Sequence, residues 1–540
     1  MSNRVAHYLQ EHLLGEVVYS SDARSYFSTD GSILRLVPSL IVYPRNENDI
    51  RKTARFAWQL AERGRIIPLT ARGAGTNQTG SAIGNGIIIA FTAHMNRILE
   101  LNTKNKSLAI EPGINYGKLQ QVLHTHGFFL PPYPPDLDYV TIGGAIASNV
   151  VGEKSFRYGS TKSFTKELRV VLANGEVIKT KKLSKRELSK KLGLATFEGE
   201  IYRSIDTLIE ENRQIIDTMQ RSTTINSAGY NLYDVKQKDG SFDLTPLIVG
   251  SEGTLGIISE AQLDIEFYDP ESLIIKAEFD SLEKLQQALN AINESKNLPV
   301  SIELVDKQAL EQIYEINPNH LKGLINDPLP SFVVIIEYEG AKKLSKSIVR
   351  ILDNFTRSFE TTTDIQEQIN FRKIRESVNM ITAHNDALLH SLPLFDGAVP
   401  IDRAREYLEG IYRIVNDNNL KTAIWGHIGD GNLTMQPKLN LGQVGDRQKI
   451  FRLFNEYYQL ILSLNGTVSA LNGDGRLRTP YLESMYGQEA YRLFAKVKQI
   501  FDPYNILNPG VKFNTSIEDL KGIIRQEFSL NHLYDHLPRS

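Results

Sequence analysis

The sequence predicts an α+β protein with two or three hydrophobic cores. Its 540 residues, of which 41% are hydrophobic and 23% charged, are enough for two or three domains. Strand-like and helix-like segments alternate along the chain, but without the regular repetition of a parallel α/β fold. We identify no internal repeat, no low-complexity segment and no clear linker.

The first elements follow from short patterns. "SLIVYP" predicts a buried strand, and the stretch after it predicts a helix with Asn46 as its N-cap and Gly64 at its C-terminal end. Asn174 and Gly175 separate two alternating runs. Asparagine followed by glycine favours the two positive φ angles of a type I′ turn, so this pair predicts a β-hairpin.

The pattern changes near Pro270. Strand-like and helix-like runs follow in the order β-α-β and then β-α, which predicts a second sheet with helices on one face, of ferredoxin-like kind. The residues beyond about position 440 are again helical. We therefore predict an N-terminal helical segment at 1–34, a first domain at 35–269, a second domain at 270–460 and a C-terminal helical segment at 461–540.

Composition excludes several kinds of protein. The chain has 61 Lys+Arg and 63 Asp+Glu, so it lacks the excess of positive charge that would favour nucleic acid as a partner. The absence of cysteine excludes disulfides, thiolate zinc sites, cysteine-ligated iron-sulfur clusters and a cysteine nucleophile. The sequence contains no run of 18 apolar residues that would predict a transmembrane segment. We therefore expect a cytoplasmic protein. The lysine-rich stretch at 179–191 is either a solvated helix, which we favour, or a surface for peripheral membrane contact.

Three glycine clusters are candidate ligand-binding segments. The first, "ARGAGTNQTGSAIGNG", is not the G-x-G-x-x-G fingerprint, and it is not a P-loop because Ser81 stands where the lysine is needed. Its backbone N–H groups, Arg72 and nearby hydroxyls suit a pyrophosphate, and a purely structural loop fits these residues equally well. "TIGGAIASN" and "LIVGSEGTLGIISEAQL" are the other two. Three clusters in one half of the chain favour a large phosphate-bearing cofactor.

Taken in order, "RGAGT", "TIGGAIASN", "YGST" and "VGSEGTLGIISEA" resemble the flavin-binding half of the vanillyl-alcohol oxidase superfamily, whose FAD-binding domain is of the PCMH type. FAD-linked oxidases of the D-lactate dehydrogenase, glycolate oxidase and D-2-hydroxyglutarate dehydrogenase type match best. The resemblance continues through "FRKIRES", "GHIGDGN", "NGDGRLRTPYL" and "FDPYNILNPG". It implies a two-subdomain PCMH-type FAD-binding domain at 35–269, a substrate or cap domain at 270–460 and a C-terminal segment that returns to the flavin.

The resemblance also implies which residues bind FAD. The diphosphate loop and the segments beside the flavin comprise Arg72, Gly73, Ala74, Gly75, Thr76, Gly80, Ser81, Thr141, Gly143, Gly144, Ser148, Tyr158, Glu252, Gly253, Ile258, Asn432 and Asn508. Superfamily members that attach FAD covalently in the first loop have a histidine where this chain has Thr76. The flavin is therefore expected to be non-covalent.

Relatives of this type transfer a hydride from the α-carbon of a D-2-hydroxy acid to flavin N5 while a base takes the hydroxyl proton. Arg375 matches their carboxylate-binding arginine, and an ordinary helical arginine is the alternative. His427 matches the first of two metal-binding histidines, and a hydrogen-bonded loop residue is the alternative. The strands on either side predict that positions 427 and 434 face each other.

The sequence departs from the family at the chemical positions. Thr434 replaces the second histidine, Leu471 replaces a glutamate ligand, and Asn472 replaces the base. Threonine and leucine supply no ligands here and His427 alone is too few, so we predict no catalytic metal. Because Asn472 cannot accept a proton, His427 is the candidate base or donor. The predicted catalytic positions are therefore His427, Arg375 and Asn472.

Three interpretations stay open. The chain is an FAD dehydrogenase with altered 2-hydroxy acid chemistry, which we favour, or an FAD-binding protein without turnover that serves as a scaffold, or an active parent changed deliberately. The expected substrate is a small hydroxy acid. Because the chain has no cysteine to ligate a cluster, its electrons need an external acceptor, such as a quinone, a flavoprotein or a separate iron-sulfur subunit.

Overall fold

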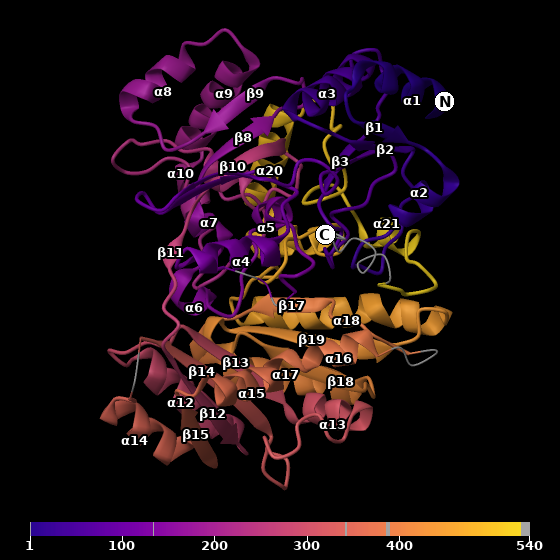
Figure 1. Cartoon of the computed structure of the whole chain (residues 1–540). Coiled ribbons are helices and arrows are strands. Elements are labelled where there is room, and N and C mark those ends of the chain that lie inside the picture. The colour runs from indigo at the N-terminus through magenta and orange to yellow at the C-terminus, as the bar shows by residue number, and fades with distance from the viewer. Residues whose placement is uncertain (1, 133, 135, 341–342, 385–388, 531–540) are drawn as a thin grey trace.

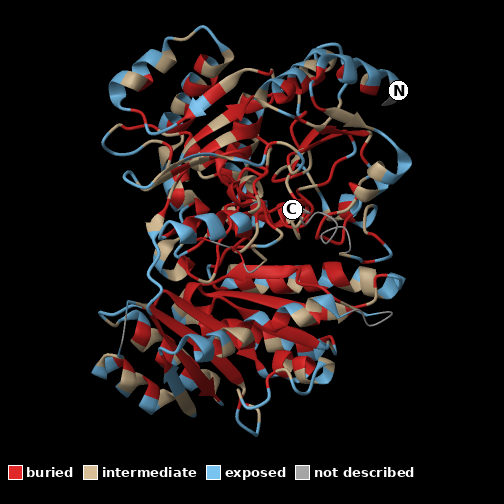
Figure 2. Ribbon diagram, in the orientation of Figure 1, coloured by how far each residue is buried: buried red, intermediate tan, exposed pale blue. Residues whose placement is uncertain are grey.

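The computed structural model describes residues 2–132, 134, 136–340, 343–384 and 389–530. Figure 1 shows the indigo-to-magenta part of the chain above the salmon and orange part, with the yellow C-terminal part returning to the upper half. The buried residues, red in Figure 2, fill the sheets of both halves. The chain therefore builds two bodies in sequence and then links them through its C-terminal part.

The first sheet has the order β1-β2-β4-β3, and its three longer strands are parallel. Its strands are β1 (Glu16–Val18), β2 (Leu40–Tyr43), β3 (Leu69–Arg72) and β4 (Ile87–Ala90). The predicted helix is confirmed as α3 (Glu47–Ala61), and the Asn46 side chain accepts a hydrogen bond from the Asp49 N–H as its N-cap. The N-terminal segment holds α1 (Ser2–His12) and α2 (Ser21–Tyr26), and β1 between them extends this sheet.

The second sheet is antiparallel, in the order β5-β6-β10-β8-β9. Its strands are β5 (Ile98–Asn102), β6 (Ser107–Ile110), β8 (Thr165–Val171), β9 (Val177–Thr180) and β10 (Ile257–Asp264), and the short pair β7 (Phe128–Phe129) and β11 (Glu266–Phe267) lies beside it. The predicted hairpin joins β8 to β9. The predicted type I′ turn is wrong, because Gly175 has a positive φ of +83° and Asn174 does not. The loop is longer, closed by a hydrogen bond from Leu172 N–H to the Glu176 carbonyl.

Helices surround this second sheet. They are α4 (Tyr116–Thr125), α5 (Ile142–Ser148), α6 (Ser155–Tyr158), α7 (Thr161–Phe164), α8 (Lys185–Leu192), α9 (Phe197–Glu211), α10 (Arg213–Thr218) and α11 (Thr245–Ile248). The lysine-rich stretch contains α8, which has one buried residue, Leu188, and a capping box at Ser184 and Glu187. The expected helix is therefore confirmed, and the choice between solvent and membrane contact stays a prediction.

The lower half begins with the predicted ferredoxin-like unit. Its elements are β12 (Ser272–Phe279), α12 (Leu282–Asn293), β13 (Ser301–Asp306), β14 (Phe332–Glu339), α14 (Lys346–Phe355) and β15 (Ser358–Thr362), with α13 (Lys307–Ile316) inserted before β14. The strands pair in the order β15-β12-β14-β13. Numbered within the unit this is 4-1-3-2, the antiparallel order of a β-α-β-β-α-β fold, so the ferredoxin-like prediction is confirmed.

A second, incomplete copy of this unit follows. It consists of β17 (Phe395–Ala398), α17 (Ala404–Asp417), β18 (Thr422–Gly426), β19 (Asn432–Leu439) and α18 (Val444–Ser463). β19 lies between β17 and β18, and a single bridge from Thr467 to Ala398 stands where the fourth strand would be. β13 pairs with β18, so the two copies form one eight-stranded sheet with β16 (His390–Ser391). This internal repeat was not visible in the sequence.

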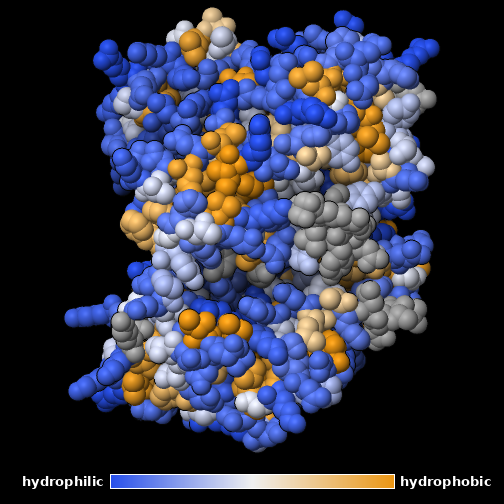
Figure 3. Space-filling view, in the orientation of Figure 1, coloured by the Kyte–Doolittle hydropathy of each residue, from blue (hydrophilic) through white to orange (hydrophobic). Residues whose placement is uncertain are grey.

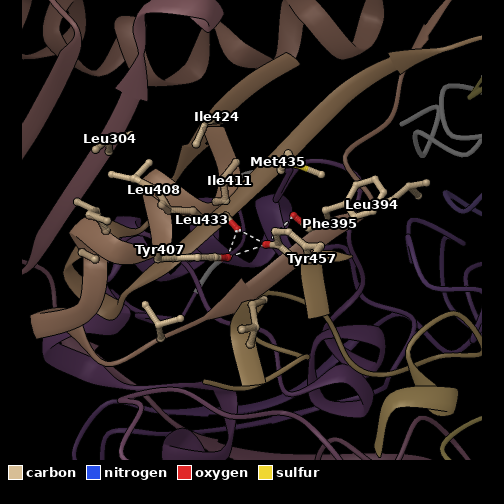
Figure 4. Close-up of a cluster of buried hydrophobic side chains, with 14 of the residues drawn as sticks. Leu304, Leu394, Phe395, Tyr407, Leu408, Ile411, Ile424, Leu433, Met435 and Tyr457 are labelled. Atoms are coloured by element: carbon tan, nitrogen blue, oxygen red, sulfur yellow. Dashed lines mark hydrogen bonds between the residues drawn. The ribbon is translucent and has the colours of Figure 1, made fainter. Parts of the chain in front are cut away.

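Helices cover both faces of the eight-stranded sheet, so the prediction that they cover one face is wrong. The core on one face contains side chains from α12, α14, α17 and α18, and the core on the other contains side chains from α13, α15 (Ile365–Glu376) and α16 (Val378–Ala383). Figure 4 shows the first core, where the Tyr407 and Tyr457 hydroxyls share a hydrogen bond at 2.6 Å and both lie within hydrogen-bonding distance of the Leu433 carbonyl. These bonds hold β19, which carries one end of the turn predicted to face the flavin.

The C-terminal segment joins the halves. α19 (Leu482–Tyr486) and α20 (Gln488–Phe501) follow the large sheet, and α20 packs in the core that contains α9. Leu507 then bridges to Leu69 at the start of β3, and α21 (Ile517–Lys521) is the last helix described. In the part of the chain described, no helix has both the length and the hydropathy to cross a bilayer. The face seen in Figure 3 is mostly hydrophilic, with separate hydrophobic patches on both halves.

Candidate active site

A cavity of about 570 Å³ lies where the three parts of the chain meet. The upper half contributes the three glycine clusters, the cap contributes α16, Pro393 and Trp425, and the C-terminal segment contributes Leu471, Asn472, Phe528 and Leu530. Segments far apart in the sequence thus share one lining. A cavity of this size at a domain junction is the usual setting of a cofactor and its substrate.

Arg72 ends β3 and lines the cavity, although only 1% of its surface is exposed. Its Nη1 donates to the carbonyls of Thr29 (2.8 Å) and Ala82 (3.2 Å), while Nε and Nη2 have no partner. Burial lowers the pKa of the guanidinium to about 10, so it stays charged at neutral pH. A buried cation with free N–H groups fits a phosphate oxygen.

The glycines beside Arg72 are required by close contacts. A Cβ on Gly75, whose φ is +78°, would lie 2.2 Å from Arg72 Nη2, and one on Gly73 would lie 2.0 Å from Thr141 Oγ1. Thr141 in turn caps α5 by accepting a hydrogen bond from Gly144 N–H at 3.3 Å. The first two clusters therefore pack together through atoms that leave no room for side chains.

The third cluster is held against α5. The N–H groups of Gly250 and Glu252 donate to the carbonyls of Ile146 and Ala147. Glu252 lines the cavity; its Oε2 accepts from Gly475 N–H at 2.9 Å and lies 3.7 Å from Lys512 Nζ, while Oε1 has no partner. Desolvation raises the pKa of this carboxyl group. The three clusters thus form one continuous wall.

Most of the predicted FAD-binding residues line this cavity. They are Arg72, Gly73, Ala74, Gly75, Thr76, Ser81, Thr141, Gly143, Gly144, Ser148, Glu252, Gly253 and Ile258. The free N–H groups of Arg72 and the glycine wall fit the phosphates and the flat ring of FAD. Their individual contacts with FAD stay predictions.

Four predicted FAD contacts lie outside the lining of this cavity. The Gly80 carbonyl accepts a hydrogen bond from Arg476 Nη1, and the Tyr158 hydroxyl donates to Glu339 of the cap at 2.6 Å. The Asn508 amide donates to the carbonyls of Ser81 and Glu252, at 2.9 and 2.8 Å, and so ties the first cluster to the third. Contacts of these residues with the flavin remain untested predictions.

Asn432 is the fourth predicted FAD contact that lies outside the cavity lining. Its Nδ2 donates to Asp396 Oδ1 at 2.6 Å and to the Gly397 carbonyl at 2.9 Å, and its Oδ1 is buried without a partner. The same Asp396 accepts from the N–H groups of Leu471 (3.2 Å) and Asn472 (3.1 Å) and pairs with Arg478 at 3.0 Å. Asp396 therefore holds the loop at 471–472 on the cavity wall.

Arg375 and His427 meet at a residue that sequence reasoning missed. Glu303, in β13, accepts from Arg375 Nε at 2.8 Å through one oxygen and lies 2.6 Å from His427 Nδ1 through the other. All three side chains are at most 6% exposed. The structure thus brings the two predicted catalytic residues together, but neither lines the cavity.

The predicted pairing of positions 427 and 434 is wrong. Thr434 lies opposite Trp425, and Asn432 N–H donates to the His427 carbonyl at 3.1 Å. The turn is tighter than expected because the short η2 helix (Ile428–Asp430) and Gly431, with φ +67°, close it. Thr434 Oγ1 is buried without a partner.

No group of three or more histidines and carboxylates is arranged to hold a metal within the described ranges. At the three chemical positions stand Thr434, Leu471 and Asn472, of which only the last two line the cavity. Asn472 Nδ2 donates to Gln78 Oε1 at 3.4 Å. These residues do not fit a divalent ion, whose ligands are imidazole, carboxylate or thiolate. The absence of a catalytic metal stays a prediction.

A signal for the missed acids was present in the sequence. Glu303 lies in "SIELV" and Asp396 in "LFDGAV", each a carboxylate with apolar residues on both sides in a strand pattern. A buried charge is costly unless it is paired and hydrogen-bonded, so such a position indicates a specific partner. The pattern does not say which cation or donor that partner is.

Comparison with known proteins agrees with this geometry. Residues 38–181 match the family described as "FAD binding domain", and residues 271–511 match "FAD linked oxidases, C-terminal domain". The chain is 27% identical to D-2-hydroxyglutarate dehydrogenase of Pantoea ananatis over 96% of this chain and 52% of the relative. It is 26% identical to glycolate oxidase subunit GlcD of Bacillus subtilis, covering 92% of each, and 24% identical to D-lactate dehydrogenase of Archaeoglobus fulgidus, covering 87% and 90%.

Solved structures share the fold. The 4-ethylphenol oxidase from Gulosibacter chungangensis superposes with a TM-score of 0.67 at 16% identity, covering 96% of this chain and 98% of that one. An alkyldihydroxyacetonephosphate synthase gives 0.59 at 16% identity, covering 94% and 84%. Fold and site thus define a two-domain flavoprotein with a PCMH-type FAD-binding domain. The chain belongs to the family of FAD-linked oxidases. It spans about half the length of the curated D-2-hydroxyglutarate dehydrogenases it matches.

Proposed function

We propose that the chain is an FAD-dependent oxidoreductase that oxidises the CH–OH group of a small hydroxy acid or of a derivative of one. The observation that carries this proposal is the shared cavity, whose lining joins the three glycine clusters to Trp425, Leu471 and Asn472. The names of the relatives, D-2-hydroxyglutarate dehydrogenase, D-lactate dehydrogenase and glycolate oxidase subunit, support a hydroxy acid as the parent of the substrate.

Bound FAD supplies the acceptor for the hydride that leaves the substrate carbon. Residues of this chain would hold it: the free N–H groups of Arg72 would bond the phosphates, and Gly73 and Gly75 would leave room for them. Thr76 lines the cavity and cannot form the histidyl link of covalent relatives, which supports a non-covalent flavin. The electrons then leave to a quinone, a flavoprotein or a separate iron-sulfur subunit.

We propose His427 as the residue that takes the hydroxyl proton. A proton on Nδ1 donated to the Glu303 carboxylate leaves Nε2 as an acceptor, and Nε2 has no other partner. Glu303 thus fixes the tautomer and stabilises the imidazolium that forms. Asn472, on the cavity wall, is proposed to orient the substrate hydroxyl rather than to accept its proton. No step requires a metal.

A second candidate, an FAD-binding protein without turnover, is supported by one observation. Arg375 and His427 are both bound by Glu303 and lie outside the lining of the cavity. On this proposal the chain keeps FAD as a structural group.

One anaerobic experiment separates the two. The FAD-loaded protein is mixed with D-lactate, D-2-hydroxyglutarate, glycolate and their amides, and bleaching of the visible flavin band is followed. Bleaching within seconds by any of them supports the oxidoreductase. A flavin that only dithionite reduces supports the protein without turnover, and a protein that takes up no FAD contradicts both. The variant His427→Gln should slow bleaching about 10²–10⁴-fold if His427 is the base.

A further inference from the structure

The described lining residues that come from the cap and the C-terminal segment carry no charge. From the cap and the C-terminal segment come Asn379, Met380, Thr382, Ala383, Pro393, Trp425, Leu471, Asn472, Phe528 and Leu530. Most of these side chains are apolar and the others are amides or a hydroxyl. A substrate seated against this wall meets hydrophobic surface and a few neutral hydrogen-bonding groups.

Positive charge is confined to one place in the lining. Among the lining residues described, Arg72 is the single cation, and it lies in the phosphate loop. The carboxylates of Asp136, Asp138 and Glu252 also line the cavity. When the FAD phosphates pair with Arg72, the described part of the lining offers an anionic substrate carboxylates and no free cation.

Arg375, the residue expected to bind a substrate carboxylate, is used elsewhere. Its Nε donates to Glu303 at 2.8 Å, and its Cζ lies 4.5 Å from the ring centre of Trp425. Trp425 itself lines the cavity, and its indole N–H is already bonded to Gln436 at 2.7 Å. At this point the cavity is therefore lined by the ring of Trp425, and the charge of the Arg375 guanidinium is neutralised by the buried Glu303 carboxylate. Desolvating a carboxylate without a paired cation is costly.

We propose that the substrate is an uncharged 2-hydroxy carbonyl compound, an ester or amide of a 2-hydroxy acid with an apolar body. This inference rests on the proposed oxidation of a CH–OH group. The apolar wall binds the body, and Asn472 and Thr382 provide the neutral groups that bond the hydroxyl and the carbonyl oxygen. The oxidation itself is unchanged: the carbinol carbon loses a hydride to FAD and its hydroxyl loses a proton, leaving a 2-oxo ester or amide.

Matched pairs of compounds test this. D-mandelamide against D-mandelate, and D-lactamide against D-lactate, differ in little but the charge of the carboxyl group at pH 7. With FAD-loaded protein under anaerobic conditions, the amide of each pair should reduce the flavin with a rate constant per concentration at least about tenfold above that of the acid. Equal rates, or faster reduction by the acids, would overturn the inference.

A binding readout keeps the inference separate from the proposed function. If none of the four compounds bleaches the flavin, the proposed oxidation fails, but each compound is also titrated against oxidised FAD while its visible spectrum is recorded. A dissociation constant for D-mandelamide at least about tenfold below that for D-mandelate supports an uncharged ligand even without turnover. Equal or tighter binding of the acid, or no spectral change with either, overturns it.

A charge introduced in the wall should remove most of the preference for the amide. Met380→Lys adds an ammonium group on a side chain of similar length at the edge of α16, where the side chain is half-buried, and Met380→Gln is the uncharged control. We expect Met380→Lys to lower the dissociation constant of D-mandelate about tenfold. Met380→Gln should leave the ratio of the dissociation constants of acid and amide within about threefold of the parent. An unchanged ratio in the lysine variant, in a protein that still binds FAD, would contradict the role assigned to this wall.

Discussion

Replacing Arg72 by lysine tests the phosphate loop directly. The substitution keeps one positive charge but removes the planar fork, so the charge can still face an anion while the second free N–H group is lost. Arg72 Nε and Nη2 are the two groups without a partner, and Nη1 already serves the carbonyls of Thr29 and Ala82.

The magnitude follows from that count. A hydrogen bond to a charged group contributes about 1.5–3 kcal/mol. Losing one of the two bonds to the phosphates should therefore weaken FAD binding about 10- to 150-fold. Riboflavin has no phosphate and should not lose affinity. Arg525 is a matched control because its pKa is also lowered to about 10 by burial, yet it does not line the cavity.

The assay is a titration of deflavinated protein with FAD and with riboflavin, followed by flavin fluorescence. Arg72→Lys should raise the dissociation constant of FAD and leave that of riboflavin within about threefold, while Arg525→Lys should change neither. The reasoning is refuted if Arg72→Lys binds FAD as tightly as the parent does, or if it weakens the binding of riboflavin as much as that of FAD. Urea unfolding of each variant shows whether the fold is intact.

Three further predictions concern the cap and its turn. Glu303→Gln should lower the free energy of unfolding by about 3–5 kcal/mol because it leaves Arg375 buried without a charged partner, whereas Glu409→Gln, in an exposed pair, should cost under about 1 kcal/mol; similar losses in urea unfolding would contradict this. Burial raises the pKa of Asp430 from 3.8 to about 7, so the folded state holds a proton that the unfolded state has released, and stability should fall as pH rises between these values. Asp430→Asn should remove about 1–3 kcal/mol of that fall between pH of about 4.5 and 7.5, and an unchanged pH profile would refute the assignment. The last prediction concerns a variant with three substitutions, Thr434→His, Leu471→Glu and Asn472→His. It should take up about one equivalent of Mn²⁺ or Zn²⁺ by elemental analysis, and no uptake would mean that the surrounding pocket differs too.

Much of the fold was predictable because its causes are local. Asn46 caps its helix through its own side chain, and the apolar spacing that follows needs no distant partner. The β-α-β order near residue 272 predicted a ferredoxin-like unit for the same reason. The second copy of that unit was missed because its fourth strand is reduced to one bridge at Thr467, which no sequence pattern marks.

The candidate site was predictable only in part. The sequence displays the cavity-lining glycines Gly73 and Gly75 as a cluster, and the structure gives the reasons: Gly75 has φ +78°, and a Cβ on Gly73 would clash with the Thr141 side chain. Tyr158 and Asn508 carry motif positions too, yet they lie outside the lining: the Tyr158 hydroxyl binds Glu339, and the Asn508 amide binds the backbone carbonyls of Ser81 and Glu252. A motif fixes which residue is present, and the neighbours decide what its polar atoms bind.

Sequence alone determined the cofactor class, the ferredoxin-like cap and the departures at Thr434, Leu471 and Asn472, since these depend on residue identity and on short-range pattern. Only the tertiary structure decided that the Glu303 carboxylate bonds to both Arg375 and His427. Glu303 stands 72 residues from the arginine and 124 from the histidine. The pairing of β13 with β18 brings His427 to it, and the packing of α15 against β13 brings Arg375. Burial then makes the pairing obligatory, because a carboxylate in an apolar strand is stable only beside a cation and hydrogen-bond donors.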